Sequence, residues 1–338
     1  MSQFIVSPGL VGQRLDRALA KLTAATRSHI KMLIEHECVH VAGVVQKAGY
    51  ALRLGDVIEI APLVEPLAAA VPQKIALEIL YEDDFLAAIN KPAGMVVHPA
   101  PGQWQGTVVN ALLAYWGWQE SPASLRPGIV HRLDKDTSGV LLVAKDHQTQ
   151  ERLAAQFKER RIHKEYVAVV VGRFSALQGE IALPIGRHPS DRKKMSVHAR
   201  HSRAAVSRYQ VISQAQAMSL LRLFPETGRT HQLRVHLAAI GHPIVGDAVY
   251  GTRAMLRDLP PEGREFPRQA LHAAAIEFCH PATQHPLAIV APYPADLARL
   301  IETLQFDKEE RKEKGELPSF VIDRKKKIQY SKTKSQIT

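Results

Sequence analysis

A proline-rich segment at residues 62–75 divides the chain into two unequal parts. It carries Pro62, Pro66 and Pro72 and a run of three alanines. Proline lacks a backbone hydrogen-bond donor and stops helix propagation, so such a segment is typical of a linker between domains. We therefore expect a small domain at residues 1–61 and a larger one at 76–305. The length of 338 residues is consistent with two domains.

The small domain is expected to contain two short helices followed by short strands. Apolar residues recur at helical spacing within 15–22 and again within 30–34. Valines around Gly43 and the alternating residues of 57–60 are typical of short strands joined by tight turns. Basic residues accompany these elements and predict an RNA-binding face formed by Arg14, Arg27, Lys31 and Lys47.

The larger domain is dominated by strand-like segments that do not alternate strictly with helices. The strand-like segments are 86–90, 128–130, 139–144, 166–172, 205–213 and 219–224. The helix-like stretches are 106–116, 147–160, 230–240 and 294–305. This irregular order favours a mixed α+β domain over a doubly wound parallel one. The sequence contains no GxGxxG motif and no Walker loop, which removes the usual nucleotide-cofactor interpretations.

The chain is strongly basic, with 44 Lys and Arg against 33 Asp and Glu and a formal net charge of +11. We expect a polyanionic partner, RNA or DNA before an anionic membrane, with a solvated basic surface as the alternative. Residues 187–208 carry seven basic side chains against Asp191 alone, and this block predicts a groove wall for a phosphate backbone. We assign RNA binding there to Arg192, Lys193 and Lys194.

The chain end at 306–338 is basic as well, with ten basic against six acidic residues. We expect this tail to be disordered, because it has few apolar groups to offset the entropy of ordering. No apolar run approaches the ~18 residues of a membrane helix, and the start of the chain lacks a signal-peptide pattern. Two distant cysteines, Cys38 and Cys279, provide neither a disulfide framework nor a zinc motif. These features predict a cytoplasmic protein that does not contact membranes.

The densest polar segment is HRLDKDTSG at 131–139, which lies between two apolar runs. A strand before it and a strand after it would display this segment as a loop on a rigid support. Asp134 and Asp136 are two residues apart, so in an extended loop only one of them faces a given pocket. An ordinary polar hairpin is the alternative interpretation.

A second polar segment, TGRTHQLRVH at 227–236, is expected to form a helix capped by Thr227. On a helix Arg229 and Leu233 share one face, while His231 and Arg234 share another. His231 and His236 are five residues apart, which does not match the spacing of a helical zinc pair. The alternative here is a surface helix with scattered charges.

Two further motifs complete a set of four that resembles the RluA-type pseudouridine synthase family. The motifs are INKPAGMVVHP at 89–99, HRLDKDTSG at 131–139, KEYVAVVVG at 164–172 and TGRTHQLRVHLAAIGHPIVGDAVYG at 227–251. The resemblance spans about residues 76–300 and implies a mixed, largely antiparallel sheet. The amino-terminal part resembles the small α/β RNA-binding domain named after ribosomal protein S4. Within the family, the chain is most similar to the D group, which modifies large-subunit ribosomal RNA.

The resemblance implies isomerisation of uridine to pseudouridine, a reaction that needs no cofactor and no metal. It makes Asp134 the catalytic aspartate and Tyr166 the active-site tyrosine, which stacks on the target base and is a candidate for proton transfer. Leu233 would form the apolar wall of the pocket, and Arg132 would contact RNA near the vacated base position. A buried carboxylate stays ionised only beside a cation, and we expect Arg229 to be that cation. The target base would have to be flipped out of its helix.

The implied partners are large-subunit ribosomal RNA and a pre-ribosomal particle, bound by a monomer. Three other functions stay open from the sequence. One is the same reaction on transfer RNA or another ribosomal site, and the second is a non-catalytic ribosome-assembly protein. The third is a glycosidase that uses Asp134 and Asp136 as its carboxylate pair.

Overall fold

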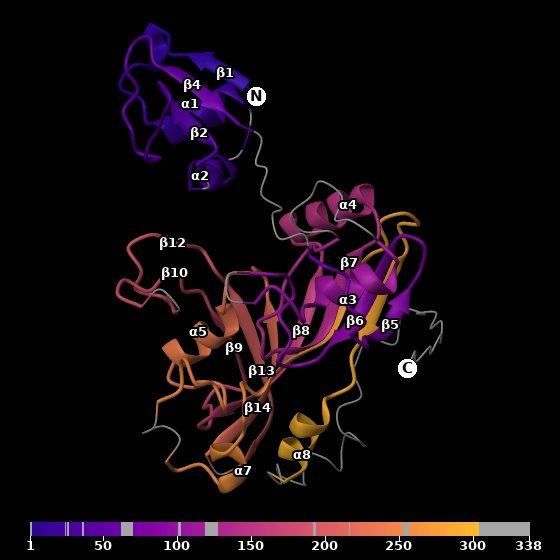
Figure 1. The fold of residues 1–338 in the computed structure, drawn as a ribbon. Helices are drawn as coiled ribbons and strands as arrows, with labels where there is room; N and C mark the ends of the chain where they lie inside the picture. The colour runs from indigo at the N-terminus through magenta and orange to yellow at the C-terminus, as the bar shows by residue number, and fades with distance from the viewer. Residues whose placement is uncertain are drawn as a thin grey trace. The chain divides into compact units, whose positions relative to one another are not determined.

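A computed structural model describes residues 2–23, 25, 27–35, 37–61, 70–100, 103–118, 128–191, 194–215, 217–252 and 257–303. The chain separates into two compact units, Met1–Ala69 and Ala70–Thr338, which are described one at a time (Figure 1). Most of the predicted linker and the whole predicted tail at 306–338 lie outside the described residues. No helix in the described part of the chain is long and apolar enough to cross a membrane.

The first unit packs two helices against a small antiparallel sheet. Its strands are β1 (Ser2–Ile5), β2 (Val39–Val41), β3 (Val44–Val45) and β4 (Val57–Ile60), in the order β1-β4-β2-β3. Its helices are α1 (Leu15–Leu22) and α2 (Arg27–Glu35), with a short 3-10 turn at Pro8–Leu10. Leu15, Leu19 and Ile30 are among the buried core residues, as their helical spacing predicts. Strand β1 was not expected. Its residues are mostly exposed, so the sequence carries little apolar pattern there, and the strand is held by pairing with β4.

The second unit is built on a nine-stranded mixed sheet. Its strands are β5 (Glu78–Glu82), β6 (Leu86–Lys91), β7 (Ser138–Ala144), β8 (His163–Val171), β9 (Gln178–Ile181), β13 (Ser207–Ala215), β14 (Met218–Pro225), β15 (Leu271–Cys279) and β16 (Pro286–Val290). The order is β5-β6-β7-β15-β8-β14-β13-β9, and β16 pairs with β15. Only the β7–β15 pair is parallel, so the predicted largely antiparallel α+β fold is confirmed.

Helices α3 (Val108–Tyr115) and α4 (His147–Lys158) cover opposite faces of this sheet at β7. Consecutive side chains of a strand point to opposite faces of the sheet, which explains the arrangement. Leu142 of β7 packs in one cluster with Leu153 of α4, and Leu141 packs in another with Leu112 of α3. Every residue of β7 is buried. The loop that precedes β7 therefore ends on a fixed strand in the middle of the unit.

The remaining elements lie around the other half of the sheet. They are α5 (Gln232–Ala239), α7 (Pro261–Arg264), α8 (Ala295–Thr303) and a three-stranded sheet of β10 (Ile185–Arg187), β11 (Met195–Ser196) and β12 (Ser202–Arg203). Figure 1 shows β10 and β12 as a separate projection beside α5. The expected strand at 128–130 is wrong: Ile129 forms only an isolated bridge with Val143.

Candidate active site

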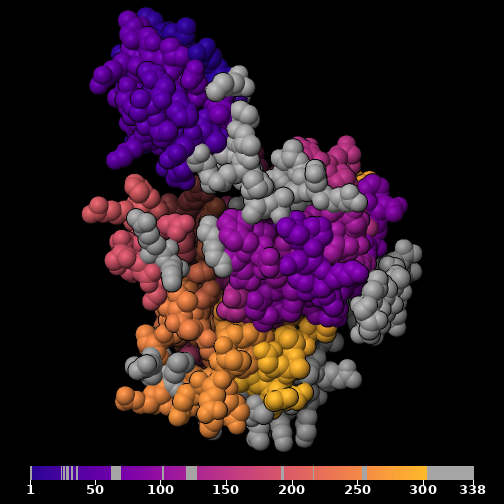
Figure 2. Space-filling model, in the orientation of Figure 1, coloured from indigo at the N-terminus to yellow at the C-terminus, as the bar shows by residue number. Residues whose placement is uncertain are grey.

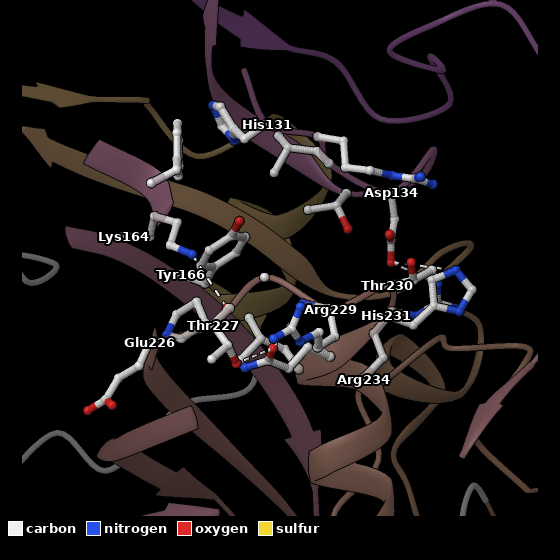
Figure 3. Close-up of a pocket in the computed structure, with 18 of the residues that line it drawn as sticks. His131, Asp134, Lys164, Tyr166, Glu226, Thr227, Arg229, Thr230, His231 and Arg234 are labelled. Carbon is white, nitrogen blue, oxygen red and sulfur yellow. Dashed lines mark hydrogen bonds and ion pairs between the residues drawn. The ribbon is translucent and has the colours of Figure 1, made fainter. Parts of the chain in front are cut away.

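A cavity of about 500 Å³ opens in the second unit. Four segments line most of it (Figure 3): the 131–137 loop before β7, the end of α4 with Arg160, the start of β8, and the stretch 225–234 that leads from β14 into α5. A cavity of this volume suits a ligand of nucleotide size. Three of the four sequence motifs therefore meet at one site: HRLDKDTSG, KEYVAVVVG and the one that begins TGRTHQLRVH.

Lys91, at the end of β6, anchors the 131–137 loop. Its side chain is 0% exposed and its ammonium donates to the carbonyls of Pro92, Met95 and Lys135 at 2.7, 2.9 and 3.0 Å. Burial lowers the pKa of Lys91 to about 7, and the charges of nearby acids only partly oppose this. The Lys-Pro-Ala-Gly turn thus has a structural task, because it ties the loop to β6.

Gly139 and Arg268 fix the other end of the loop. Gly139 has a φ of 112°, and a Cβ atom there would collide with the carbonyl of Ala273 on β15. Only glycine lets the two strands approach at this point. Arg268 donates to the carbonyl of Asp136 at 3.1 Å and is itself held by Asp296. Asp136 contributes its backbone to the loop, and its side chain does not line the cavity.

Asp134 lines the cavity and is held by Arg234 of α5. Nη1 of Arg234 donates to Oδ2 of Asp134 at 3.0 Å, while Nε and Nη2 donate to the carboxylate of Asp247 at 2.7 and 2.9 Å. The side chain of Asp247 is 0% exposed, so the guanidinium has a fixed support. Burial acts to lower the pKa of Arg234, but its bonds to Asp247 and the charge of Asp134 raise it overall. A permanent cation therefore stands beside Asp134.

The prediction that Arg229 pairs with Asp134 is wrong. Arg229 lines the same cavity, but its Nε donates to the carbonyl of Ala204 at 3.2 Å. The reason is the position at which α5 begins. The helix starts at Gln232, so Arg229 lies in the turn before it, and the first inward-facing arginine of the helix is Arg234.

Gln232 organises that turn. Its Oε1 accepts from Oγ1 of Thr227 at 2.7 Å and from the backbone N–H of Arg229 at 3.0 Å, and its Nε2 donates to the carbonyl of Val206 at 2.9 Å. Thr227 is consequently a buried part of the turn and does not cap α5. His231 occupies the N-cap position with a φ of 55° and no side-chain cap bond.

Five predicted site residues line the cavity: Asp134, Tyr166, Leu233, Arg132 and Arg229. Tyr166 comes from β8, where it is paired with Leu223 on one side and Ala273 on the other. Burial, followed by the charge of Asp134, raises the pKa of Tyr166. Its hydroxyl is therefore protonated at neutral pH. The structure brings these residues together, and their catalytic roles remain predictions.

The sequence patterns gave no catalytic or binding role to four residues that the structure makes candidates: Arg234, Asp247, His231 and Lys164. Nε2 of His231 lies 4.0 Å from Oδ2 of Asp134, and its Nδ1 bonds the hydroxyl of Tyr250 at 2.8 Å. Only one sequence feature pointed to any of these residues: His231 and Arg234 were expected to share a helix face. No local pattern marks Asp247, because its role depends on a contact across thirteen residues.

The residues predicted to bind RNA fall on two surfaces. In the first unit, Arg14 and Arg27 bind the buried carboxylate of Asp16 at 3.0 and 2.7 Å, and about half of each guanidinium side chain is exposed. Lys31 is exposed on α2. In the second unit, the described part of the basic block lies on and around β10, β11 and β12, and Lys194 belongs to it. Arg192 and Lys193 lie outside the described residues.

The other chemistries weighed from the sequence find little support in this site. Asp136 does not line the cavity with Asp134, so the two do not form a glycosidase pair there. The described residues contain no group of three or more His, Cys, Asp or Glu side chains that could hold a metal ion.

The chain matches two family models. The model described as RNA pseudouridylate synthase matches residues 86–239, and the S4 domain model matches residues 13–58. The first match contains the 131–137 loop, β8 and the start of α5, and the second covers most of the first unit.

Two similar proteins that match most of the chain carry the same name. The chain is 42% identical over 313 residues to ribosomal large subunit pseudouridine synthase D of Xanthomonas campestris pv. campestris, covering 91% of this chain and 93% of that protein. It is 43% identical over 320 residues to the protein of the same name from Escherichia coli K12, covering 91% and 95%.

Solved structures agree with the fold. Human RNA pseudouridylate synthase domain containing 4 has a TM-score of 0.55 and 28% identity, covering 68% of this chain and 94% of that chain. Human RNA pseudouridylate synthase domain containing 1 has a TM-score of 0.53 and 26% identity, with the same coverage. These likenesses confirm the predicted family, fold class and type of activity. The chain belongs to the RNA pseudouridylate synthase family and is an RNA pseudouridine synthase with an S4 domain in its amino-terminal part.

Proposed function

We propose that this enzyme converts uridines of large-subunit ribosomal RNA to pseudouridine, with Asp134 as its catalytic carboxylate. The observation that carries the proposal is the placement of Asp134 in a nucleotide-sized cavity beside Arg234. Relatives that match nearly the whole chain are named for the large ribosomal subunit, which favours this RNA as the target.

The reaction rearranges bonds without net gain or loss of atoms. The bond from C1′ to N1 of the uracil breaks, the base turns, and a bond from C1′ to C5 forms. C5 then loses its proton and N1 gains one. A carboxylate at the sugar and a surface on which the base can turn are the minimum requirements, and Asp134 and Tyr166 supply them in one cavity.

The target base must leave its helix to reach Asp134, which costs a few kcal/mol. Stacking on the half-buried ring of Tyr166 offsets part of that cost, since base–aromatic stacking contributes about 1–3 kcal/mol. Leu233 closes the cavity with an apolar surface, and Arg132 stands at the same cavity with its cation available to the RNA backbone. The arrangement favours a flipped uridine held between an aromatic ring and a carboxylate.

Binding outside the cavity would come from the S4 domain and the basic block. Arg14, Arg27 and Lys31 present cations on the S4 domain, and Lys194 does so beside β10. Contacts of this type bind phosphates without reading sequence. The domains assigned from the sequence, a monomeric state, a pre-ribosomal substrate and a cytoplasmic location belong to the same proposal.

The decisive experiment maps pseudouridines in total RNA from cells with and without the gene. We expect sites in large-subunit ribosomal RNA to disappear and to return with the wild-type gene, but not with Asp134→Asn. Loss of sites in transfer RNA alone would contradict the proposed target and leave the activity itself intact.

A further inference from the structure

Lys164 lines the cavity, and its ammonium group has few hydrogen-bond partners within the described part of the chain. It lies two residues before Tyr166 on β8, so both side chains emerge on the same face of the strand. Figure 3 shows Lys164 and Asp134 on opposite sides of the cavity, with Tyr166 between them in the view. One hydrogen bond of Lys164 is recorded among the described residues, a long one of 3.5 Å from Nζ to the carbonyl of Thr227.

Two acidic residues, Glu165 next to Lys164 in the sequence and Glu226 at the same cavity, are engaged elsewhere. Glu165 forms a bidentate pair with Arg222 at 2.7 Å, and Glu226 pairs with Arg208 at 2.8 Å. Within the described part of the chain no ion pair is recorded for Lys164. Burial lowers the pKa of Lys164 to about 8, and burial together with the charge of Lys164 lowers the pKa of His131 to about 3. Lys164 is therefore a cation on this wall, and His131 is neutral.

A half-buried ammonium with one long hydrogen bond costs stability, because the hydration that it loses is only partly replaced. A methionine would fill the same space at lower cost. A lysine at this position is explained if the substrate supplies the hydrogen-bond acceptor that the protein does not. That partner must accept a hydrogen bond and gain from a positive charge.

The reacting uracil provides such a partner. When the bond from C1′ to N1 breaks, the electron pair passes to the ring, and the negative charge spreads over its carbonyl oxygens. Addition of a carboxylate to the ring would likewise place charge on a carbonyl oxygen. Both routes therefore call for a cation at the edge of the base, whichever step comes first. A preorganised donor in a dry site is most effective where charge develops.

The geometry meets this requirement. Lys164 and Asp134 lie on opposite sides of the cavity (Figure 3), so a base stacked on Tyr166 with its sugar toward Asp134 would turn its far edge toward Lys164. We propose that Lys164 is a further catalytic residue, whose ammonium donates a charge-assisted hydrogen bond to a carbonyl oxygen of the flipped uracil and stabilises the negative charge that builds there. This assignment rests on the base flipping proposed above. It distinguishes Lys164 from Lys158, an exposed cation at the same cavity that is suited to a backbone phosphate.

The test compares Lys164→Met, Lys164→Arg and the matched control Lys158→Met in the full-length protein. The substrate is an RNA in which the wild-type enzyme forms pseudouridine, so the result does not depend on which RNA is the natural target. Single-turnover rates are measured at saturating enzyme, and dissociation constants by filter binding. We expect Lys164→Met to lower the saturated rate about 100-fold, as for loss of one oxyanion donor. The dissociation constant should change less than about threefold, and Lys164→Arg should recover part of the rate.

Thermal unfolding separates this role from a structural one. Removing a half-buried charge that has no ion-pair partner among the described residues should leave the melting temperature of Lys164→Met equal to or above that of the wild type. Lys158→Met should weaken binding, with a shallower salt dependence, and should lower the saturated rate far less than Lys164→Met does. The proposal is overturned if Lys164→Met behaves like Lys158→Met, which would assign Lys164 to a phosphate. It is equally overturned if the rate and the melting temperature fall together.

Discussion

Nη1 of Arg234 lies 3.0 Å from Oδ2 of Asp134, and this contact joins the start of α5 to the loop before β7. The two residues are one hundred positions apart in the chain. Their meeting depends on the sheet order that brings β7, β15, β8 and β14 side by side. The site is therefore assembled by the sheet and completed by one helix.

Asp134→Asn should abolish turnover and leave RNA binding largely intact. The amide keeps the shape of the side chain but cannot act as a nucleophile or base. We expect the rate to fall by roughly 1,000-fold or more, the range seen when a group essential to chemistry is lost. Tritium release from RNA labelled at C5 of uridine measures the rate, and filter binding measures affinity. Turnover near the wild-type value would remove Asp134 from the mechanism.

Asp247→Asn should lower the rate by loosening Arg234. The bidentate pair needs two acceptor oxygens, and the amide offers one. We expect the saturated rate to fall about tenfold or more, with little change in RNA affinity, because Asp247 does not line the cavity. Asp83→Asn is the control, since it removes a carboxylate that binds Tyr81 and His280, and none of these three residues lines the cavity. An equal loss of rate in both variants would contradict a specific role for Asp247.

Tyr166→Phe and Tyr166→Ala should separate stacking from hydrogen bonding. Phenylalanine keeps the ring, so RNA affinity should stay within about threefold of wild type. Alanine removes the ring and should cost about 1–3 kcal/mol of base binding. Because the pKa of Tyr166 is raised, its hydroxyl does not ionise near neutral pH, and neither variant should alter the pH profile between 6 and 9. Fluorescence titration with substrate RNA and rates at several pH values would detect any deviation.

Sequence patterns predicted the parts of this fold that are encoded locally. The helices at 147–160 and 230–240 and the buried strand at 139–144 follow from periodicity, and the structure contains α4, α5 and β7 there within a few residues. The placement of Asp134 on a displayed loop was predictable because apolar runs flank it. The partner of Asp134 was not, since it depends on the residue at which α5 begins. The hydrogen bonds of Gln232 to Val206 and Thr227 hold the turn before α5 and so set where the helix begins. No local sequence pattern reveals these bonds.

Deletion of residues 1–61 should weaken RNA affinity more than it slows chemistry on bound substrate. The first unit has its own core and carries exposed cations, while every residue that lines the cavity belongs to the second unit. We expect the dissociation constant to rise at least about tenfold and the saturated rate to change less than threefold. Equal affinity with and without this segment would refute a binding role for the S4 domain.

The stability of the S4 domain should depend on pH through Asp16. Hydrogen bonds from Arg14, then from Arg27, outweigh burial and lower the pKa of Asp16 from 3.8 to about 2. The folded pKa lies below the unfolded one, so the stabilisation is complete above pH 4 and is lost as the pH falls through 2. We expect Asp16→Asn to reduce the free energy of unfolding at pH 7 by about 1 kcal/mol. The effect is small because water around the half-exposed guanidinium groups screens their attraction to the carboxylate.

Hydrogen exchange of the amides of α1 measures this difference within the full-length protein. The gap between the wild type and Asp16→Asn should be present at pH 7 and close toward pH 2. Tryptophan fluorescence serves as the internal control, because Trp104, Trp116 and Trp118 all lie in the second unit. The fluorescence transition should be the same in both proteins. A gap that persists at pH 2 would show that Asp16 stabilises α1 through its shape and not through its charge.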